Sequence, residues 1–217
     1  MANEIFIYDE IGPEWYGMVD SKSIIRQLDA FRGQPVTVRI NSPGGSVTEG
    51  QAIYNALKRH DGDVTIAVDA IAASSASVIA MAGKRIEMAA NSLMMIHNAW
   101  TITIGDKAEH EKVIGILDKF GGAIRDRYAE RTGLSGDEIQ SMLDAETWMT
   151  AEEAVAKKFA DAVTGSNDVA ACAIKEGRYL KTPAMALAAQ LPREQARKRR
   201  EQDASLRLRL TRARFGR

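Results

Sequence analysis

The chain has 217 residues, of which 45% are hydrophobic and 27% are charged, and its formal net charge is zero. These values predict a soluble globular protein with one domain of ordinary size, and no apolar run approaches the length of a membrane-spanning helix. The single cysteine, Cys172, excludes an intrachain disulfide framework and favours a reducing compartment, here the cytoplasm. The first residues lack the basic and apolar segments of a signal peptide, so we expect none.

The charge is distributed unevenly along the chain. Residues 169–217 carry 13 Lys or Arg against 4 Asp or Glu, a balance of +9, which leaves −9 for residues 1–168. We therefore expect an acidic folded domain over residues 1–166 and a basic, partly disordered extension over residues 167–217. The alternative is that the extension is an arm for an acidic partner, for a neighbouring subunit or, less favoured, for nucleic acid.

The first half of the chain alternates between strand and helix patterns. Helices are predicted after Asp20 or Ser21 and over residues 47–59, where apolar residues recur with helical spacing. The alternation predicts an α/β fold, in which a mostly parallel sheet is covered by helices through right-handed crossovers. Apolar and β-branched residues predict strands over residues 4–11, 35–40, 63–68, 85–88 and 93–96.

The second half of the chain is mainly helical. A broad apolar face predicts a long helix over residues 106–131, which a Gly-Gly pair could bend. Two capping boxes, each a Ser or Thr followed by Glu three residues later, predict helices that begin after Ser135 and near Thr150. We expect residues 144–149 to link these two helices and residues 159–163 to form a last strand.

The segment from Asp69 to Gly83 is rich in Ala and Ser and follows a predicted strand. We interpret it as the start of a buried helix, where a hydroxyl in the first turn would lie in the positive field of unpaired N–H groups. Ser74 or Ser75 is therefore a candidate nucleophile. The alternative, which this stretch favours when taken alone, is a tightly packed Ala/Ser helix without chemistry.

Two further candidates follow the ends of predicted strands. Gly44 and Gly45 form a tight break whose N–H groups can stabilise an oxyanion, although a purely structural turn fits equally well. His97 ends an apolar run, whereas His60 and His110 lie in polar helical surroundings. We therefore prefer His97 as a general base, with a core histidine as the alternative. Because the carboxyl ends of parallel strands share one edge of a sheet, we expect these groups and the candidate serines to lie together.

A serine–histidine pair also needs a carboxylate that orients the imidazole. Asp144, Glu146 and Asp161 all follow the long helix, and the residues alone do not choose among them. No cluster of His, Cys, Asp and Glu has the spacing of metal ligands, so we expect neither a metal nor another cofactor.

Taken together, these residues resemble the Clp protease family of serine peptidases, which has the ClpP/crotonase fold. The resemblance covers about residues 4–164 and implies a repeated β-β-α superhelix with a parallel sheet and a protruding helical hairpin element. Four motifs carry it in the family's order: Asn41-Ser42-Pro43-Gly44-Gly45 with Ile53-Tyr54, Ala72-Ala73-Ser74 with Ala82-Gly83, Met95-Ile96-His97-Asn98, and Thr150 to Val155.

The resemblance implies a role for each candidate. The family's acid lies four residues before the Ser or Thr that opens the last helix, which places it at Glu146. The housekeeping enzymes usually have Asp there, so Glu146 is a departure, and Asp144 stays an alternative. The other implied roles are nucleophile for Ser74, general base for His97, and oxyanion hole for the N–H groups of Gly45 and Ser75.

The sequence of residues 73–83 and 146–148, together with a short N-terminal segment, resembles that of phage and prophage head-maturation peptidases of the same family. That resemblance implies trimming of capsid or scaffold proteins in the host cytoplasm or the prohead. It also implies homo-oligomeric rings packed through the long helix, with an ATPase partner left open. The alternatives are a housekeeping peptidase partnered with an ATPase, an inactive assembly protein and, less favoured, an acyl-CoA hydratase or isomerase.

Overall fold

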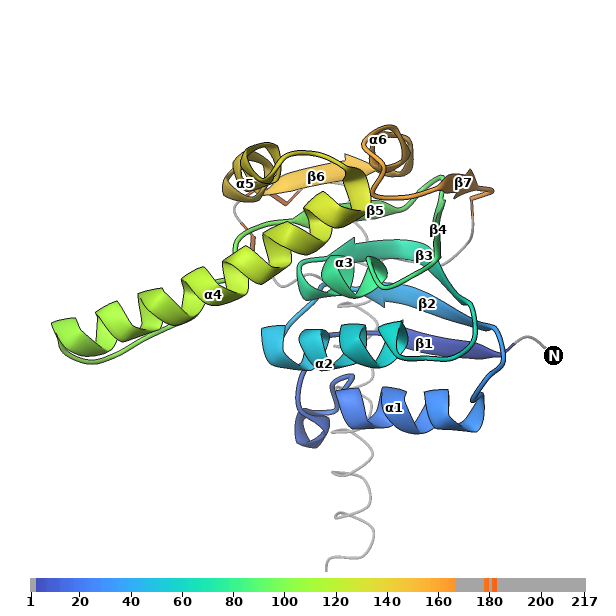
Figure 1. The fold of residues 1–217 in the computed structure, drawn as a ribbon, viewed down its shortest axis with the longest axis horizontal. Helices are drawn as coiled ribbons and strands as arrows, with labels where there is room; N and C mark the ends of the chain where they lie inside the picture. The colour runs from blue at the N-terminus through green and yellow to red at the C-terminus, as the bar shows by residue number, and fades with distance from the viewer. Residues whose placement is uncertain (1–2, 167–177, 180, 183–217) are drawn as a thin grey trace, which may run out of the picture.

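The computed structural model describes residues 3–166, 178, 179, 181 and 182. They form a seven-stranded sheet in the order β1-β2-β3-β4-β7, with β5 paired to β3 and β6 paired to β5 (Figure 1). All pairs are parallel except β5 with β6, so the predicted α/β fold with a mostly parallel sheet is confirmed. The strands are β1 (Glu4–Tyr8), β2 (Val36–Ser42), β3 (Val64–Ala73), β4 (Arg85–Ala89), β5 (Leu93–Ile96), β6 (Thr147–Thr150) and β7 (Ala162–Thr164).

The long central strand β3 links two parts of the sheet. Its first half, from Thr65 to Val68, pairs with β4, and its last residues, from Ile71 to Ala73, pair with β5. The interpretation of residues 69–73 as the start of a helix was wrong. All five residues are buried, residues 71–73 pair with β5, and Ala72 also pairs with β2, and these ladder contacts outweigh the helical preference of alanine.

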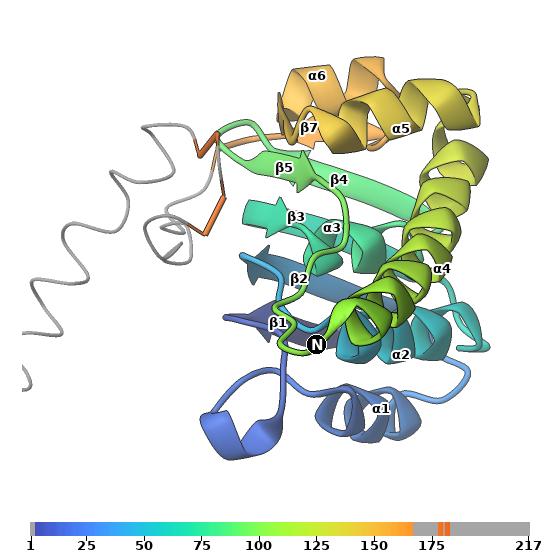
Figure 2. The ribbon, with the colours of Figure 1, turned by 90° about the vertical axis from the view of Figure 1, so that its left-hand side faces the viewer.

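Three helices cover one face of the sheet (Figure 2). They are α1 (Ser21–Ala30), α2 (Val47–Lys58) and the short α3 (Ser75–Ala80), with α5 (Gly136–Asp144) and α6 (Ala151–Ala156) at the end formed by β5, β6 and β7. Asp20 caps α1, and the predicted capping boxes of α5 and α6 are both present. A tight turn or a capping side chain therefore fixes where most of these helices begin.

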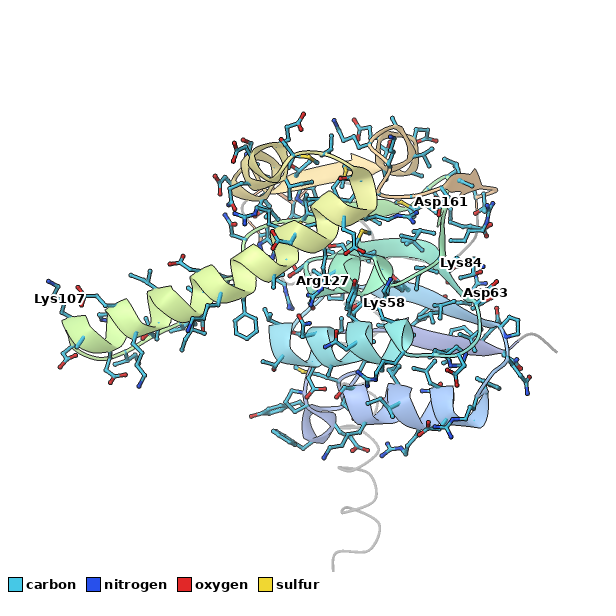
Figure 3. The ribbon with its side chains drawn as sticks, viewed as in Figure 1. Lys58, Asp63, Lys84, Lys107, Arg127 and Asp161 are labelled. Carbon is cyan, nitrogen blue, oxygen red and sulfur yellow. The ribbon has the colours of Figure 1, made fainter. Side chains whose placement is uncertain are left out.

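The predicted long helix is α4 (Lys107–Thr132), which projects far from the rest of the domain (Figure 1). Only Ile124, Tyr128 and Thr132, all near its C-terminal end, are buried, and the Gly-Gly pair does not interrupt it. The non-helical residues 97–106 run outward along α4 to its far end at Lys107 (Figure 3), so the protruding element is an extended chain and one returning helix. Within the described residues, no helix combines the length and apolarity that crossing a membrane would require.

Several predicted boundaries differ from the structure. The first strand ends at Tyr8 rather than residue 11, because the chain there turns to form an isolated bridge with Gly45. The expected linker at residues 144–149 instead contains the start of β6, which pairs antiparallel with β5. Cys172 and the basic run after residue 193 lie outside the described residues.

One charged network lies on the central strands. Asp69, only 2% exposed, sits on β3 between the part that pairs with β4 and the part that pairs with β5. Its carboxylate accepts hydrogen bonds from Arg39 Nε at 2.9 Å, from Arg39 Nη2 and from the Tyr8 hydroxyl at 2.6 Å. Arg39 also reaches Glu4, so three neighbouring strands are joined by one bidentate ion pair and its hydrogen bonds.

We expect Arg39→Met to lower the free energy of unfolding by about 2–3 kcal/mol, because it removes the cation beside a buried carboxylate. Urea denaturation measures the change. The matched control is Lys84→Met, which breaks the exposed Lys84–Asp63 pair and should cost less than about 0.5 kcal/mol. Equal losses in the two variants would show that the Arg39 network does not stabilise the sheet.

Candidate active site

Ser74 lies at the sharp turn between β3 and α3. Its φ of 57° and ψ of −126° place it in a region that residues other than glycine rarely adopt. The backbone on either side holds this conformation: Ser74 N–H donates to Met95 O at 2.9 Å, and Ser74 O accepts from Ser77 N at the same distance. A strained strand-to-helix turn of this kind presents the serine hydroxyl at the edge of the sheet.

Ser77 supports the turn from inside the protein. Its hydroxyl lies 2.6 Å from Ser74 O, 2.8 Å from Met95 O and 2.9 Å from the Tyr128 hydroxyl. Because Tyr128 belongs to α4, this hydrogen-bond cluster ties the base of the protruding helix to the turn. Ser77 is therefore engaged in structural contacts, unlike the hydroxyl of Ser74.

His97 follows the end of β5 and faces Ser74. Its Nε2 lies 2.8 Å from Ser74 Oγ, which is hydrogen-bond distance. Burial lowers the pKa of His97 from its usual 6.5, and the positive charge of Arg178 acts in the same direction, while the negative charge of Glu146 raises it. The imidazole is therefore neutral near pH 7 and can accept a proton from the serine.

The three carboxylates that the sequence left open lie in different surroundings. Glu146, 8% exposed and with a φ of 49°, is the one whose charge acts on His97. Asp144 is exposed and accepts hydrogen bonds from Asn98 Nδ2 at 2.7 Å and Gln140 Nε2 at 2.9 Å. Asp161 accepts hydrogen bonds from the backbone N–H of Ile86 and from the guanidinium of Arg131. Of these three carboxylates, Glu146 is therefore the one with an electrostatic effect on the histidine.

The glycine break packs directly on the serine turn. Gly44 has a φ of +82°, and a Cβ there would lie 2.5 Å from Ala73 O, 2.8 Å from Ser74 Cβ and 3.0 Å from Ser75 N. Gly45 has a φ of +153°, and a Cβ there would lie even closer to the backbone oxygen of Ile11. Only glycine fits both positions, and the break is thereby placed beside the first N–H of α3.

Two backbone donors remain at this edge. Among the hydrogen bonds of the described residues, none uses the N–H of Gly45 or of Ser75. Neighbouring N–H groups are engaged, since Ser46 N donates to Ile11 O and Ile11 N donates to Gly44 O. The N–H groups of Gly45 and Ser75 are therefore available to an oxygen of a bound molecule.

Two hollows meet at Ser74 and His97. The smaller one is lined mainly by apolar atoms, including those of Val47, Val78 and Ile124. The larger one is a groove of about 670 Å³ that runs between residues 10–13 and the inner side of α4. An extended chain can lie in this groove, whereas the smaller hollow, of about 20 Å³, is only a narrow recess beside the serine.

The structure adds residues that the sequence reasoning missed. Tyr179, 6% exposed, lies with its ring centroid 5.2 Å from that of His97, in an edge-to-face arrangement. Lys181 N donates to Glu146 Oε1 at 2.6 Å, and Arg178 pairs with Glu10 at 2.7 Å. No motif or periodicity marks these residues, because their contacts form only when the chain after β7 returns to the sheet.

Comparisons with known proteins agree with this architecture. The Clp protease family model matches residues 2–167. The chain is 38% identical over 128 residues to the ATP-dependent Clp protease proteolytic subunit 1 of Chlamydia abortus, covering 56% of this chain and 66% of that protein, just under two thirds of its length. It is 32% identical over 174 residues to the subunit of the same name from Protochlamydia amoebophila, and the match covers 76% of this chain and 82% of that protein. A solved structure of a ClpP1 point mutant from Listeria monocytogenes shares the fold, with a TM-score of 0.67 and 24% sequence identity. The match covers 76% of this chain and 93% of the solved one.

We expect Glu146→Gln to lower the pKa of His97 further, because it removes the negative charge that favours the imidazolium. NMR titration of histidine-labelled protein measures the change, and His97→Gln identifies the resonance among the three histidines. Asp144→Asn is the matched control and should leave the pKa in place. A shift in Asp144→Asn with none in Glu146→Gln would instead identify Asp144 as the partner of His97.

Proposed function

The chain belongs to the Clp protease family, and we propose that it is a serine endopeptidase in which Ser74, His97 and Glu146 act as a triad. The observation that carries this proposal is the 2.8 Å contact between Ser74 Oγ and His97 Nε2 at a strained strand-to-helix turn. Two unengaged backbone N–H groups, of Ser75 at this turn and of Gly45 in the adjacent glycine break, lie at the same edge, where a tetrahedral intermediate would need them.

Each residue has a defined part in the proposed reaction. Ser74 Oγ attacks the carbonyl carbon of the peptide bond while neutral His97 takes the hydroxyl proton, and the N–H groups of Gly45 and Ser75 stabilise the oxyanion. His97 then gives the proton to the leaving amine, and an acyl-enzyme forms. A water molecule, deprotonated by His97, attacks this ester and releases the second product. Glu146 orients the imidazole and stabilises its protonated form.

Two other functions for this fold are weaker. A hydratase or isomerase acting on acyl-CoA would use the two N–H groups but would not need a serine paired with a histidine. An inactive assembly protein would not need to hold Ser74 in a strained conformation. The positive φ of Ser74 and its contact with His97 therefore both favour the peptidase.

We expect wild-type protein to gain one adduct from a fluorophosphonate probe and Ser74→Ala to gain none, as read by intact mass. Removing a triad nucleophile should lower peptide hydrolysis by about 10⁴–10⁶-fold. Ser92→Ala is the control, since its buried hydroxyl lines neither of the two hollows at the site. If the wild type stays unlabelled, the inactive assembly protein becomes the better account; if Ser74→Ala still labels, another serine is the nucleophile.

We further propose that the protein forms homo-oligomeric rings through α4. The protruding element exposes large apolar side chains that a monomer leaves in water, among them Ile104, 94% exposed, and Ile114, 56% exposed. Exposed apolar groups gathered on one projection are typical of an interface. The names of the relatives describe proteolytic subunits of an ATP-dependent protease, which supports a Clp ATPase as a partner.

Light scattering after size exclusion should show an oligomer for the wild type and smaller species for Ile114→Glu, because a charge in an apolar interface is unfavourable. Lys112→Glu, on the same exposed part of α4, is the control for added negative charge and should stay assembled. A wild type that is monomeric at every concentration would contradict the ring.

The narrower proposal is that the substrate is a phage capsid or scaffold protein. The resemblance of the sequence at residues 73–83 and 146–148 to phage head-maturation peptidases supports it. A housekeeping peptidase that depends on an ATPase is the alternative. The two differ in whether the purified, unlabelled enzyme cleaves a folded scaffold protein with no ATPase present. Failure to cleave it alone, with cleavage once an ATPase is added, would favour the housekeeping role.

A further inference from the structure

A short stretch beyond β7 lies against the catalytic side chains. Tyr179 is buried between two aromatic neighbours, with its ring centroid 5.2 Å from that of His97 and 5.9 Å from that of Trp148. Its hydroxyl donates to Pro43 O, the carbonyl just before the glycine break. Burial raises the pKa of Tyr179, so the hydroxyl stays protonated and remains a donor.

The same stretch also contacts the carboxylate of the site. Lys181 N donates to Glu146 Oε1 at 2.6 Å, and Trp148 Nε1 reaches the same oxygen at 3.3 Å. Lys181 Nζ lies 2.6 Å from Ala145 O, which fixes the chain on the far side of Glu146. A backbone N–H that donates to a carboxylate both orients the group and favours its charged form.

An ion pair anchors the start of the stretch. Arg178 Nη1 lies 2.7 Å from Glu10 Oε1, and both side chains are largely shielded from water. Glu10 follows β1, so the pair connects the returning chain to the opposite end of the sheet edge from Glu146. The stretch is therefore held at both ends, with Tyr179 pressed against His97 between them.

We propose that Arg178, Tyr179 and Lys181, here called the C-terminal clamp, are positioning residues that hold His97 and Glu146 in the orientation that the reaction needs. The proposal rests on the function proposed above and adds to it a dependence on residues beyond the 1–166 domain. Neither the imidazole nor the Glu146 carboxylate can rotate freely while the clamp is in place, because the ring of Tyr179 and the N–H of Lys181 each occupy one side.

The clamp does not block the site. The hydroxyl of Tyr179 engages the carbonyl of Pro43 and interacts with the side chain of Ser74, and it takes up neither of the N–H groups of Gly45 and Ser75. Arg178 and Tyr179 form part of the wall of the 670 Å³ groove, which stays open beside Ser74 with both in place. These contacts fit a positioning role rather than an inhibitory segment that occupies the place of the substrate.

The clamp also contributes to the environment that makes His97 a neutral base. Four groups face the imidazole: Ser74 from the turn before α3, Glu146 from the start of β6, and Arg178 and Tyr179 from the clamp. Burial, to which Tyr179 contributes, and the charge of Arg178 lower the pKa of His97, while Glu146 raises it. Loss of the Tyr179 ring should therefore raise this pKa and move the acid limb of activity to higher pH.

The test compares full-length Tyr179→Ala with Tyr179→Phe, using the pH profile of fluorophosphonate labelling. Tyr179→Ala should label about 10- to 100-fold more slowly, since a small displacement of a catalytic group can lower the rate about 100-fold. The midpoint of its pH profile, the pH at which the labelling rate is half-maximal, should move to higher pH. Tyr179→Phe keeps the ring and should restore most of the rate and the midpoint. Leu28→Ala, a buried truncation in α1, controls for loss of stability and should leave the midpoint unchanged.

The contact with Glu146 has its own pair of variants. Lys181→Pro removes the N–H that donates to the carboxylate, whereas Lys181→Ala keeps it. Labelling should therefore fall more in Lys181→Pro than in Lys181→Ala. Equal rates in these two variants would overturn the part of the proposal that concerns Glu146.

Two results for Tyr179 would overturn the clamp. One is a wild-type rate and midpoint in Tyr179→Ala. The other is faster labelling than wild type, which would make the segment an obstruction. If the wild-type protein itself does not label, the proposed function fails, but NMR titration of His97 still tests the clamp. A higher pKa in Tyr179→Ala than in Tyr179→Phe supports the contact, and equal values overturn it.

Discussion

The turn at Ser74 depends on β3 being held between two strands up to its last residue. On one side β5 pairs with Ile71 to Ala73, and on the other β2 pairs with Ala72, so the chain has no freedom to turn before Ser74. The change from strand to helix is therefore compressed into one residue, which takes a positive φ. The energy of the surrounding ladder outweighs the local strain, and the hydroxyl is left exposed at the sheet edge.

The same constraint explains the two glycines. The turn brings Ala73 O and Ser74 Cβ so close to Gly44 that no side chain fits there, and Gly45 meets the chain that follows β1 in the same way. Close backbone packing is what places the N–H groups of Gly45 and Ser75 at one edge. The electrostatics follow from this packing, because a site enclosed by backbone and apolar groups keeps the imidazole of His97 neutral.

Much of the fold was accessible from local patterns. Alternating strands and helices predicted the parallel sheet, and the capping boxes located the starts of α5 and α6, because these signals lie within a few residues of one another. Residues 69–73 show the limit of this reasoning, since their alanine-rich sequence favours a helix and only pairing with two distant strands makes them a strand. Residues 147–150 were missed for the same reason, as their partner is β5.

The residues by themselves offered Ser74 or Ser75, His97 and the Gly44-Gly45 break, because each follows the end of a strand and strand ends of a parallel sheet converge. The resemblance to the Clp protease family then assigned a role to each of them. The residues alone left the carboxylate open, and the resemblance to the family favoured Glu146 over Asp144. The tertiary structure adds that the charge of Glu146 acts on His97 whereas Asp144 bonds to Asn98, and only the tertiary structure brought Tyr179 to the histidine from a segment without any motif. Short-range spacing determines which residues can carry the chemistry, whereas long-range contacts decide which of them meet.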